Sequence, residues 1–427
     1  MYKSALINAV WLFFEKVIRM AVAFILTAKI ASTLGPYEFG IIMYIQGIVS
    51  IFVAIASLGF DSYLVKEFSN KDSLHEKLST AMMIRLSFSV IVFAVYNISL
   101  QVILDNEIER VISFILSFTI IFQTQTVLFS FFQGIEKSKI IACCGFFSLL
   151  LTSCYKIYLI LNDGTIEEFA ISLSFDVAIS FLGLCIYMFS SKADCIRISL
   201  FNAKYAKYLV KNTMPIALTA ILIAVYSRFD QWYIANQLGY NYLGVYSIAL
   251  RLVEAASFAP VALSMALIPL LSKNKDNNQF IKFYISIILL SSIVTFSLLN
   301  LASPVLISVL LDESYIEANL LIPALSLSMT FSILGVISTN YLIQINETKL
   351  RIPRIILGLL VNLTCNVLLV TDFGLIGAAM ASIFGQFVAS VLGNYFNTAT
   401  RSFFFWQMRS IISLGVYDIY VYAKKTM

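Results

Sequence analysis

The chain has 427 residues, of which 60% are hydrophobic and 12% charged, with a formal net charge of +5 and a mean hydropathy of +0.88. Soluble globular domains are about half apolar and about a quarter charged, so this composition excludes an ordinary soluble protein and indicates a polytopic membrane protein. The six cysteines form no C-x-x-C pair and the single histidine is His75. We therefore expect no disulfide and no metal site.

Twelve apolar runs are long enough to cross a bilayer, because a spanning helix needs about 20 residues. In chain order they are 8–31, 41–64, 79–100, 111–133, 140–161, 168–190, 213–236, 243–271, 281–311, 318–343, 354–371 and 374–397. A tail over 398–427 mixes aromatic and basic residues, and we expect it to lie at the cytoplasmic interface. Whether 403–422 inserts in the membrane is left open by the sequence.

The basic residues of the short loops predict the orientation. With the N-terminus in the cytoplasm, Arg110 is the single basic loop residue on the outer side and the other loop lysines and arginines lie inside. This bias predicts that both termini are cytoplasmic. It also accounts for the positive net charge, so we expect no nucleic-acid partner. The loops are short, which argues against a membrane enzyme such as a polymerase or glycosyltransferase, and we expect a non-enzymatic transporter.

A pattern near the end of the first span returns in the second half of the chain. "KIASTLGPYEFGIIMY" covers 29–44 and "YIANQLGYNYLGVYSI" covers 233–248. The matching pairs, at one constant spacing, are Ile30 and Ile234, Ala31 and Ala235, Leu34 and Leu238, Gly35 and Gly239, and Gly40 and Gly244. A local interpretation is that the glycines permit a tight outer turn. Since six spans separate the copies, the duplication predicts two parallel six-helix lobes, 1–200 and 201–397, around a central cavity.

The stretches "LGPYEFG", "FFQGIEKSK", "SRFDQWYIANQLG" and "APVALSMALIPLLSK" resemble the polysaccharide-transporter branch of the multidrug/oligosaccharidyl-lipid/polysaccharide (MOP) superfamily, and most closely the bacterial O-antigen (Wzx-type) flippases. This resemblance covers residues 1–397. It implies that an undecaprenyl-pyrophosphate-linked oligosaccharide is moved from the cytoplasmic to the periplasmic leaflet of the inner membrane, for lipopolysaccharide or a similar polymer. A polysaccharide polymerase and a chain-length regulator are the protein partners that it implies.

Basic residues within the predicted spans are costly to insert and mark candidate sites. The candidates for binding the pyrophosphate are Lys16, Arg19, Arg228 and Arg251, because arginine offers phosphate a fork of donors and lysine a point charge. The resemblance supports this choice, since basic residues on the first and eighth helices line the cavity of related lipid II flippases. The alternative is that Arg19 and Arg251 only form ion pairs within their own helices, with Glu15 and Glu254.

Uncharged polar residues form stripes on several spans and can solvate sugar hydroxyls in a hydrated cavity. The cavity candidates are Gln46, Asp61, Gln123, Thr126, Asn362 and Gln386. The stripe of the fourth span, from Thr119 to Gln133, is expected to follow one continuous helical face. Polar residues also join membrane helices to one another, so a single stripe is weak evidence. Arg85 is expected at the membrane interface, near the inner end of its span.

Three carboxylates within the spans, Glu15, Asp230 and Glu254, are candidates for coupling transport to H⁺ or Na⁺, because a buried carboxylate can carry a proton. The chain contains no nucleotide-binding loop of the G-x-x-x-x-G-K-[ST] type, so we expect no bound nucleotide and no other cofactor. The alternative function is a cation-coupled multidrug antiporter of the same superfamily. A site for drug cations favours acidic groups, whereas the central cations of this chain outnumber its carboxylates.

Overall fold

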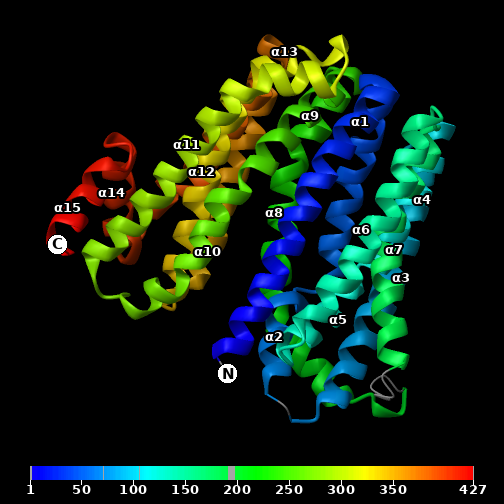
Figure 1. Ribbon diagram of the computed structural model, residues 1–427, viewed down its shortest axis with the longest axis horizontal. Coiled ribbons are helices and arrows are strands. Elements are labelled where there is room, and N and C mark those ends of the chain that lie inside the picture. Colours follow the sequence, from blue (N-terminus) through cyan, green and yellow to red (C-terminus); the bar gives the residue numbers. More distant parts are fainter. Residues whose placement is uncertain (1, 71, 105, 191–197, 427) are drawn as a thin grey trace. The chain divides into compact units, whose positions relative to one another are not determined.

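The computed structural model describes residues 2–70, 72–104, 106–190 and 198–426, with the side chains of the first helix from Ile18 onward (Figure 1). Every regular element in these ranges is a helix, which confirms the all-α class. The α-helices are α1 Tyr2–Ala56, α2 Phe60–Ser69, α3 Leu74–Ile103, α4 Glu107–Phe122, α5 Gln125–Gly134, α6 Ser138–Leu161, α7 Ile166–Ser190, α8 Ala203–Gln237, α9 Tyr240–Ala256, α10 Phe258–Lys273, α11 Asn278–Leu310, α12 Ala318–Gln344, α13 Arg351–Ser390, α14 Thr398–Ile412 and α15 Val416–Thr426.

Within the described ranges, ten segments are long and apolar enough to cross a membrane. Two of these, Ile18–Ala56 and Thr348–Asn394, each overlap two of the predicted spans. Both are kinked at a glycine with positive φ, Gly35 (73°) and Gly374 (56°), a conformation that glycine adopts without steric cost. The chain is therefore a multi-pass membrane protein.

Two compact units make up the chain, and α8 contributes to both. The first unit comprises Met1–Leu34 and Ile41–Arg228. In this unit α2, α3 and α5 share an apolar core, in which the rings of Phe68 and Phe131 meet edge to face with centroids 5.5 Å apart. The helix pairs α3–α4, α4–α7 and α6–α7 complete its packing.

The span expected over 41–64 is not one helix, because α1 ends at Ala56 and α2 begins at Phe60. Gly59 between them has a φ of 68°. A Cβ atom at this position would lie 2.6 Å from the backbone nitrogen of Ala217 on α8. The glycine therefore permits both the turn and the close approach of α8, which the hydropathy pattern does not reveal.

The continuous polar face expected on the fourth span is also wrong. The structure ends α4 at Phe122 and begins α5 at Gln125. At this break the backbone N–H groups of Thr124 and Thr126 bond carbonyls three residues back instead of four. This tighter hydrogen bonding interrupts the regular α-helical spacing on which the stripe prediction depended.

The second unit comprises Gly35–Gly40 and Phe229–Met427. Its α12 packs against α9, α10, α11 and α13. The tail forms the two short helices α14 and α15, which pack against α11 (Figure 1). Ser286 and Ser410 share a hydrogen bond of 2.8 Å, and the rings of Phe283 and Tyr422 stack at 4.5 Å. Neither tail helix is among the ten segments that are long enough to span a membrane.

The duplicated glycines meet in the second unit. A Cβ atom at Gly40 would lie 2.0 Å from the carbonyl oxygen of Tyr240, and one at Gly244 would lie 2.1 Å from the carbonyl oxygen of Pro36. The rings of Tyr37 and Tyr240 pack edge to face beside this contact. The glycine of each copy of the repeat thus packs against the backbone of the turn in the other copy. These glycines therefore permit close packing as well as turn formation.

Candidate functional site

Asp230 on α8 is the centre of a buried polar cluster in the second unit, with 8% of its surface exposed. Asn366 Nδ2 donates a hydrogen bond to Oδ1 at 2.6 Å. The Tyr246 hydroxyl donates to Oδ2 at 3.3 Å, and Ser382 Oγ donates to the same oxygen. Two helices, α9 and α13, therefore supply donors to one carboxylate on α8.

The sequence of α13 explains how one helix reaches this carboxylate twice. Asn362 and Asn366 lie one turn apart, and Asn366 Nδ2 also contacts the backbone oxygen of Asn362 at 3.0 Å and its Oδ1 at 3.3 Å. The kink at Gly374 separates this asparagine pair from Ser382. Both halves of α13 consequently contribute to the site.

Among the described residues, the side chains that hydrogen-bond Asp230 are all neutral. No lysine or arginine in the described part of the chain forms an ion pair with Asp230, whose contacts are an amide and two hydroxyls. Asn366 Oδ1 is buried and has no hydrogen-bond partner. A buried charge without an opposite charge is costly, and carboxylate, amide and hydroxyl oxygens are ligands of hard cations. These features make Asp230 a candidate for binding a proton or a small cation.

A second polar cluster lies in the first unit, where α1, α6 and α7 meet. Arg19 Nη1 and Asp176 Oδ2 form an ion pair at 3.1 Å, and Arg19 Nη2 donates to the Gly145 carbonyl at 2.6 Å. Ser148 Oγ donates to Asp176 Oδ1 at 2.9 Å. Both charged side chains are 29% exposed. Lys156 on α6 interacts electrostatically with Asp176, so two basic side chains of the described residues share this carboxylate.

Among the other charged candidates, Arg251 Nη1 and Glu254 Oε2 lie 3.5 Å apart on α9, with side chains 32% and 34% exposed. The structure thus contains the i, i+3 ion pair that the sequence allowed. Arg228 is half-buried on α8, two residues before Asp230. Glu15 and Lys16 lie outside the residues whose side chains the structure describes.

The remaining polar candidates fall in both units. Asp61 is exposed, Gln46, Gln123 and Gln386 are half-buried, and Thr126 Oγ1 is buried without a hydrogen-bond partner. Of the predicted site residues, the structure brings Asp230 and Asn362 into one cluster. The common cavity expected for the four basic residues stays a prediction.

Two arginines differ from their expected environments. Arg85 was expected at the interface, but it is 1% exposed, and its Nε and Nη1 atoms have no hydrogen-bond partner. Arg354, one of the basic residues that the charge bias assigns to the cytoplasmic side, is 5% exposed and donates to Ser338 and Asn394. Hydropathy gives no signal for either environment, because both depend on contacts with other helices.

Comparison with known proteins gives the family. Residues 5–275 match the family model described as "Polysaccharide biosynthesis protein". The capsular polysaccharide biosynthesis protein CapF of Staphylococcus aureus is 24% identical over 410 residues, which cover 91% of this chain and 98% of CapF. An uncharacterized membrane protein of Methanocaldococcus jannaschii is 23% identical over 43% of this chain, and the match spans 44% of that protein's length.

Solved structures give the fold. The lipid II flippase MurJ in an inward closed conformation aligns with a TM-score of 0.76 at 15% identity, covering 96% of this chain and 92% of MurJ. An inward-facing multidrug resistance transporter of the MATE family in the MOP superfamily aligns with a TM-score of 0.68 at 14% identity, over 95% and 98% of the two chains. The chain belongs to the polysaccharide biosynthesis protein family and has the fold of the MOP superfamily.

Proposed function

We propose that this protein is a flippase for a lipid-linked oligosaccharide, which it moves from the cytoplasmic to the periplasmic leaflet of the inner membrane. The observation that carries the proposal is the family match over residues 5–275 together with the transporter fold. In the proposal, twelve spans form two six-helix lobes, 1–200 and 201–397, which alternate in access around a central cavity. Both termini are cytoplasmic, as the basic loops predict.

The substrate proposed is an undecaprenyl-pyrophosphate-linked repeat unit, either O-antigen or capsular. Arg19 and Arg251 are about one-third exposed although each has a carboxylate partner, so each keeps accessible guanidinium surface. A pyrophosphate can exchange with such a carboxylate because arginine binds both in the same forked geometry. Lys16 and Arg228 add positive charge, and the amide and hydroxyl stripes solvate the sugars.

Asp230 is the strongest candidate for ion coupling. Glu254 already has Arg251 as its partner, whereas Asp230 is surrounded by neutral donors and is more deeply buried. Binding of H⁺ or Na⁺ at Asp230 neutralises the buried charge. Tyr246 and both halves of α13 donate to this carboxylate, so a change in its charge alters their hydrogen bonds, which couples cation binding to helix position.

The coupling proposal is tested by complementing a deletion strain with Asp230→Asn and measuring surface polymer at matched expression. We expect polymer export to be lost while the variant inserts in the membrane at the wild-type level. The matched control is Asp372→Asn, which changes an exposed carboxylate on the same helix as Asn366. Full export by Asp230→Asn would exclude this carboxylate from ion coupling.

A cation-coupled multidrug antiporter is the second candidate, and the MATE fold match favours it. The two functions differ in substrate charge, since a drug cation needs acidic groups and a pyrophosphate needs basic groups. Export of a cationic dye from cells that express the protein supports the antiporter. Loss of polymer without any change in dye export supports the flippase.

A further inference from the structure

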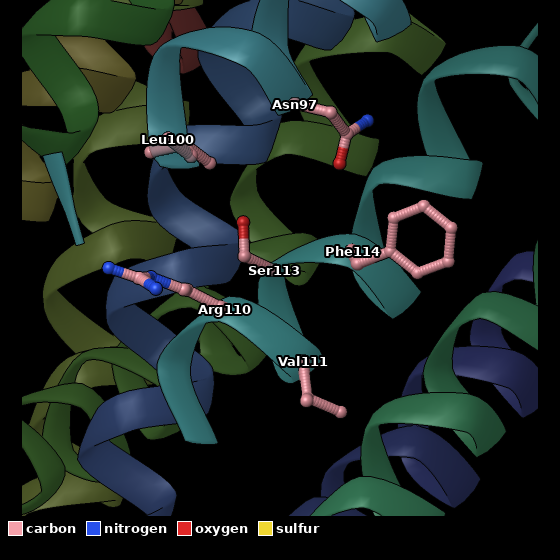
Figure 2. A pocket seen from close by; sticks show the side chains of 6 residues that line it. All are labelled: Asn97, Leu100, Arg110, Val111, Ser113 and Phe114. Atoms are coloured by element: carbon pink, nitrogen blue, oxygen red, sulfur yellow. The ribbon is translucent and has the colours of Figure 1, made fainter. Parts of the chain in front are cut away.

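We propose that a cavity between α3 and α4 of the first unit binds the headgroup of a membrane glycerophospholipid through its phosphate, with phosphatidylethanolamine as the preferred lipid. The cavity has a volume of about 480 Å³ and is lined by Asn97, Leu100, Arg110, Val111, Ser113 and Phe114 (Figure 2). The inference rests on the multi-pass membrane fold and is independent of the proposed transport function.

Arg110 supplies the positive charge of this cavity. Its Nε atom donates to the carbonyl oxygen of Leu104 at 2.6 Å, which fixes the guanidinium beside the end of α3. Within the described residues Arg110 makes no other hydrogen bond and no ion pair, so Nη1 and Nη2 remain available as donors. A guanidinium held by one edge presents its remaining N–H groups to a phosphate with a fixed geometry.

Asn97 supplies an acceptor on the facing helix. Its Nδ2 atom donates to the Phe93 carbonyl at 2.8 Å and to Ser117 Oγ at 3.2 Å, and its Oδ1 atom accepts no hydrogen bond in the described part of the chain. An amide oxygen repels a phosphate but accepts a hydrogen bond from an ammonium or hydroxyl group. Figure 2 shows Asn97 and Leu100 opposite Ser113, with Arg110 to one side. The cavity thus offers Arg110 as a partner for the phosphate of a phospholipid headgroup and Asn97 as a partner for its ammonium or hydroxyl group.

The position of the cavity fits a lipid better than a free anion. It lies where α3 ends and α4 begins, and both belong to segments long enough to cross a membrane, so it is at the depth of the headgroups. Val111 and Phe114 are 42% and 52% exposed, and Ile98 on α3 is 69% exposed. This apolar surface continues from the cavity and can pack against acyl chains.

The neighbouring charge favours a zwitterionic headgroup. Glu107 is exposed in the first turn of α4, three residues before Arg110, and so shares its helix face. A carboxylate beside the arginine repels a headgroup with a net negative charge and attracts the ammonium group of ethanolamine. Phosphatidylglycerol, which lacks the ammonium, is expected to bind more weakly at this site.

Native mass spectrometry of the full chain in detergent, titrated with phosphatidylethanolamine, phosphatidylglycerol, diacylglycerol or inorganic phosphate, tests the proposal. We expect phosphatidylethanolamine to bind most tightly, and Arg110→Gln to weaken that binding about tenfold, as expected for loss of a charge-assisted hydrogen bond. Glu107→Gln should raise the affinity for phosphatidylglycerol. The matched control is Arg401→Gln, because Arg401 Nε also contacts a carbonyl six residues earlier, that of Tyr395, at 3.3 Å.

Equal binding of phosphatidylethanolamine by the wild type and Arg110→Gln would overturn the proposal, as would diacylglycerol binding as tightly as the phospholipid. Saturable binding of inorganic phosphate at the same affinity would overturn the assignment to a lipid. A Tm measurement on Arg110→Gln shows whether loss of the Leu104 contact has altered the fold. Arg110→Lys, which keeps the charge and loses the fork, should lie between the wild type and Arg110→Gln.

Discussion

The reciprocal contact between the duplicated glycines gives a quantitative prediction. A methyl group at Gly40 or Gly244 would lie 2.0 or 2.1 Å from a carbonyl oxygen, whereas ordinary contacts begin at 3.4 Å. Each alanine substitution therefore forces two backbone segments apart by more than 1 Å. Overpacking costs about 1–3 kcal/mol, and we expect a value near the upper end because the obstructing atoms are backbone on both sides.

The assay is thermal unfolding of the purified protein in detergent. Gly40→Ala and Gly244→Ala should each lower Tm by about 5 °C or more. The double variant should lose less than the sum of the two, because one separation of the segments makes room for both methyl groups. Gly183→Ala on α7 is the matched control, since its Cβ would lie 3.7 Å from Cys144. Wild-type stability of both repeat variants, or strictly additive losses, would refute the reciprocal-contact reasoning.

Three further predictions concern polar side chains within the helix packing. Arg19→Ala should lower Tm and abolish polymer export, because it removes the partner of Asp176 and the guanidinium that binds substrate. Adding Asp176→Asn to this variant should restore Tm but not export, because it removes the unpaired carboxylate without replacing the guanidinium. Restored export in the double variant would show that the ion pair alone mattered. Arg85→Met should leave Tm unchanged or raise it, since the arginine is buried with two unpartnered nitrogens; a large fall in Tm would contradict this. Gln407→Ala should lower the free energy of unfolding by about 1–3 kcal/mol and speed proteolysis of the tail, because Gln407 donates a hydrogen bond to the Leu334 carbonyl on α12. An unchanged cleavage rate would show that other contacts hold the tail.

Much of the fold follows from hydropathy, because membrane-spanning helices must satisfy their backbone hydrogen bonds internally and therefore read as long apolar runs. For the same reason the kink at Gly35 falls between two predicted spans, and the kink at Gly374 coincides with the start of the last one. The break at Gly59 was missed because the apolar run continues through it. What determines that break is the approach of α8, a contact between residues far apart in the sequence.

The candidate site was only partly predictable. Asp230 stood out as an intramembrane carboxylate, and Asn362 stood out as a polar residue within a predicted span. Their meeting with Ser382 was not predictable, since it requires α8 and both halves of α13 to converge. Spacing in the sequence reveals neighbours on one helix, whereas partners on different helices emerge only from the tertiary packing.

The measurement that tests the proposed flippase most directly is the surface polysaccharide of the native host with and without this gene, together with the leaflet distribution of lipid-linked repeat units. Loss of surface polymer, with repeat units accumulating on the cytoplasmic leaflet and restored by the wild-type gene, is the predicted result. Unchanged polymer and an unchanged pool, in a host without a second flippase, would contradict the proposed function.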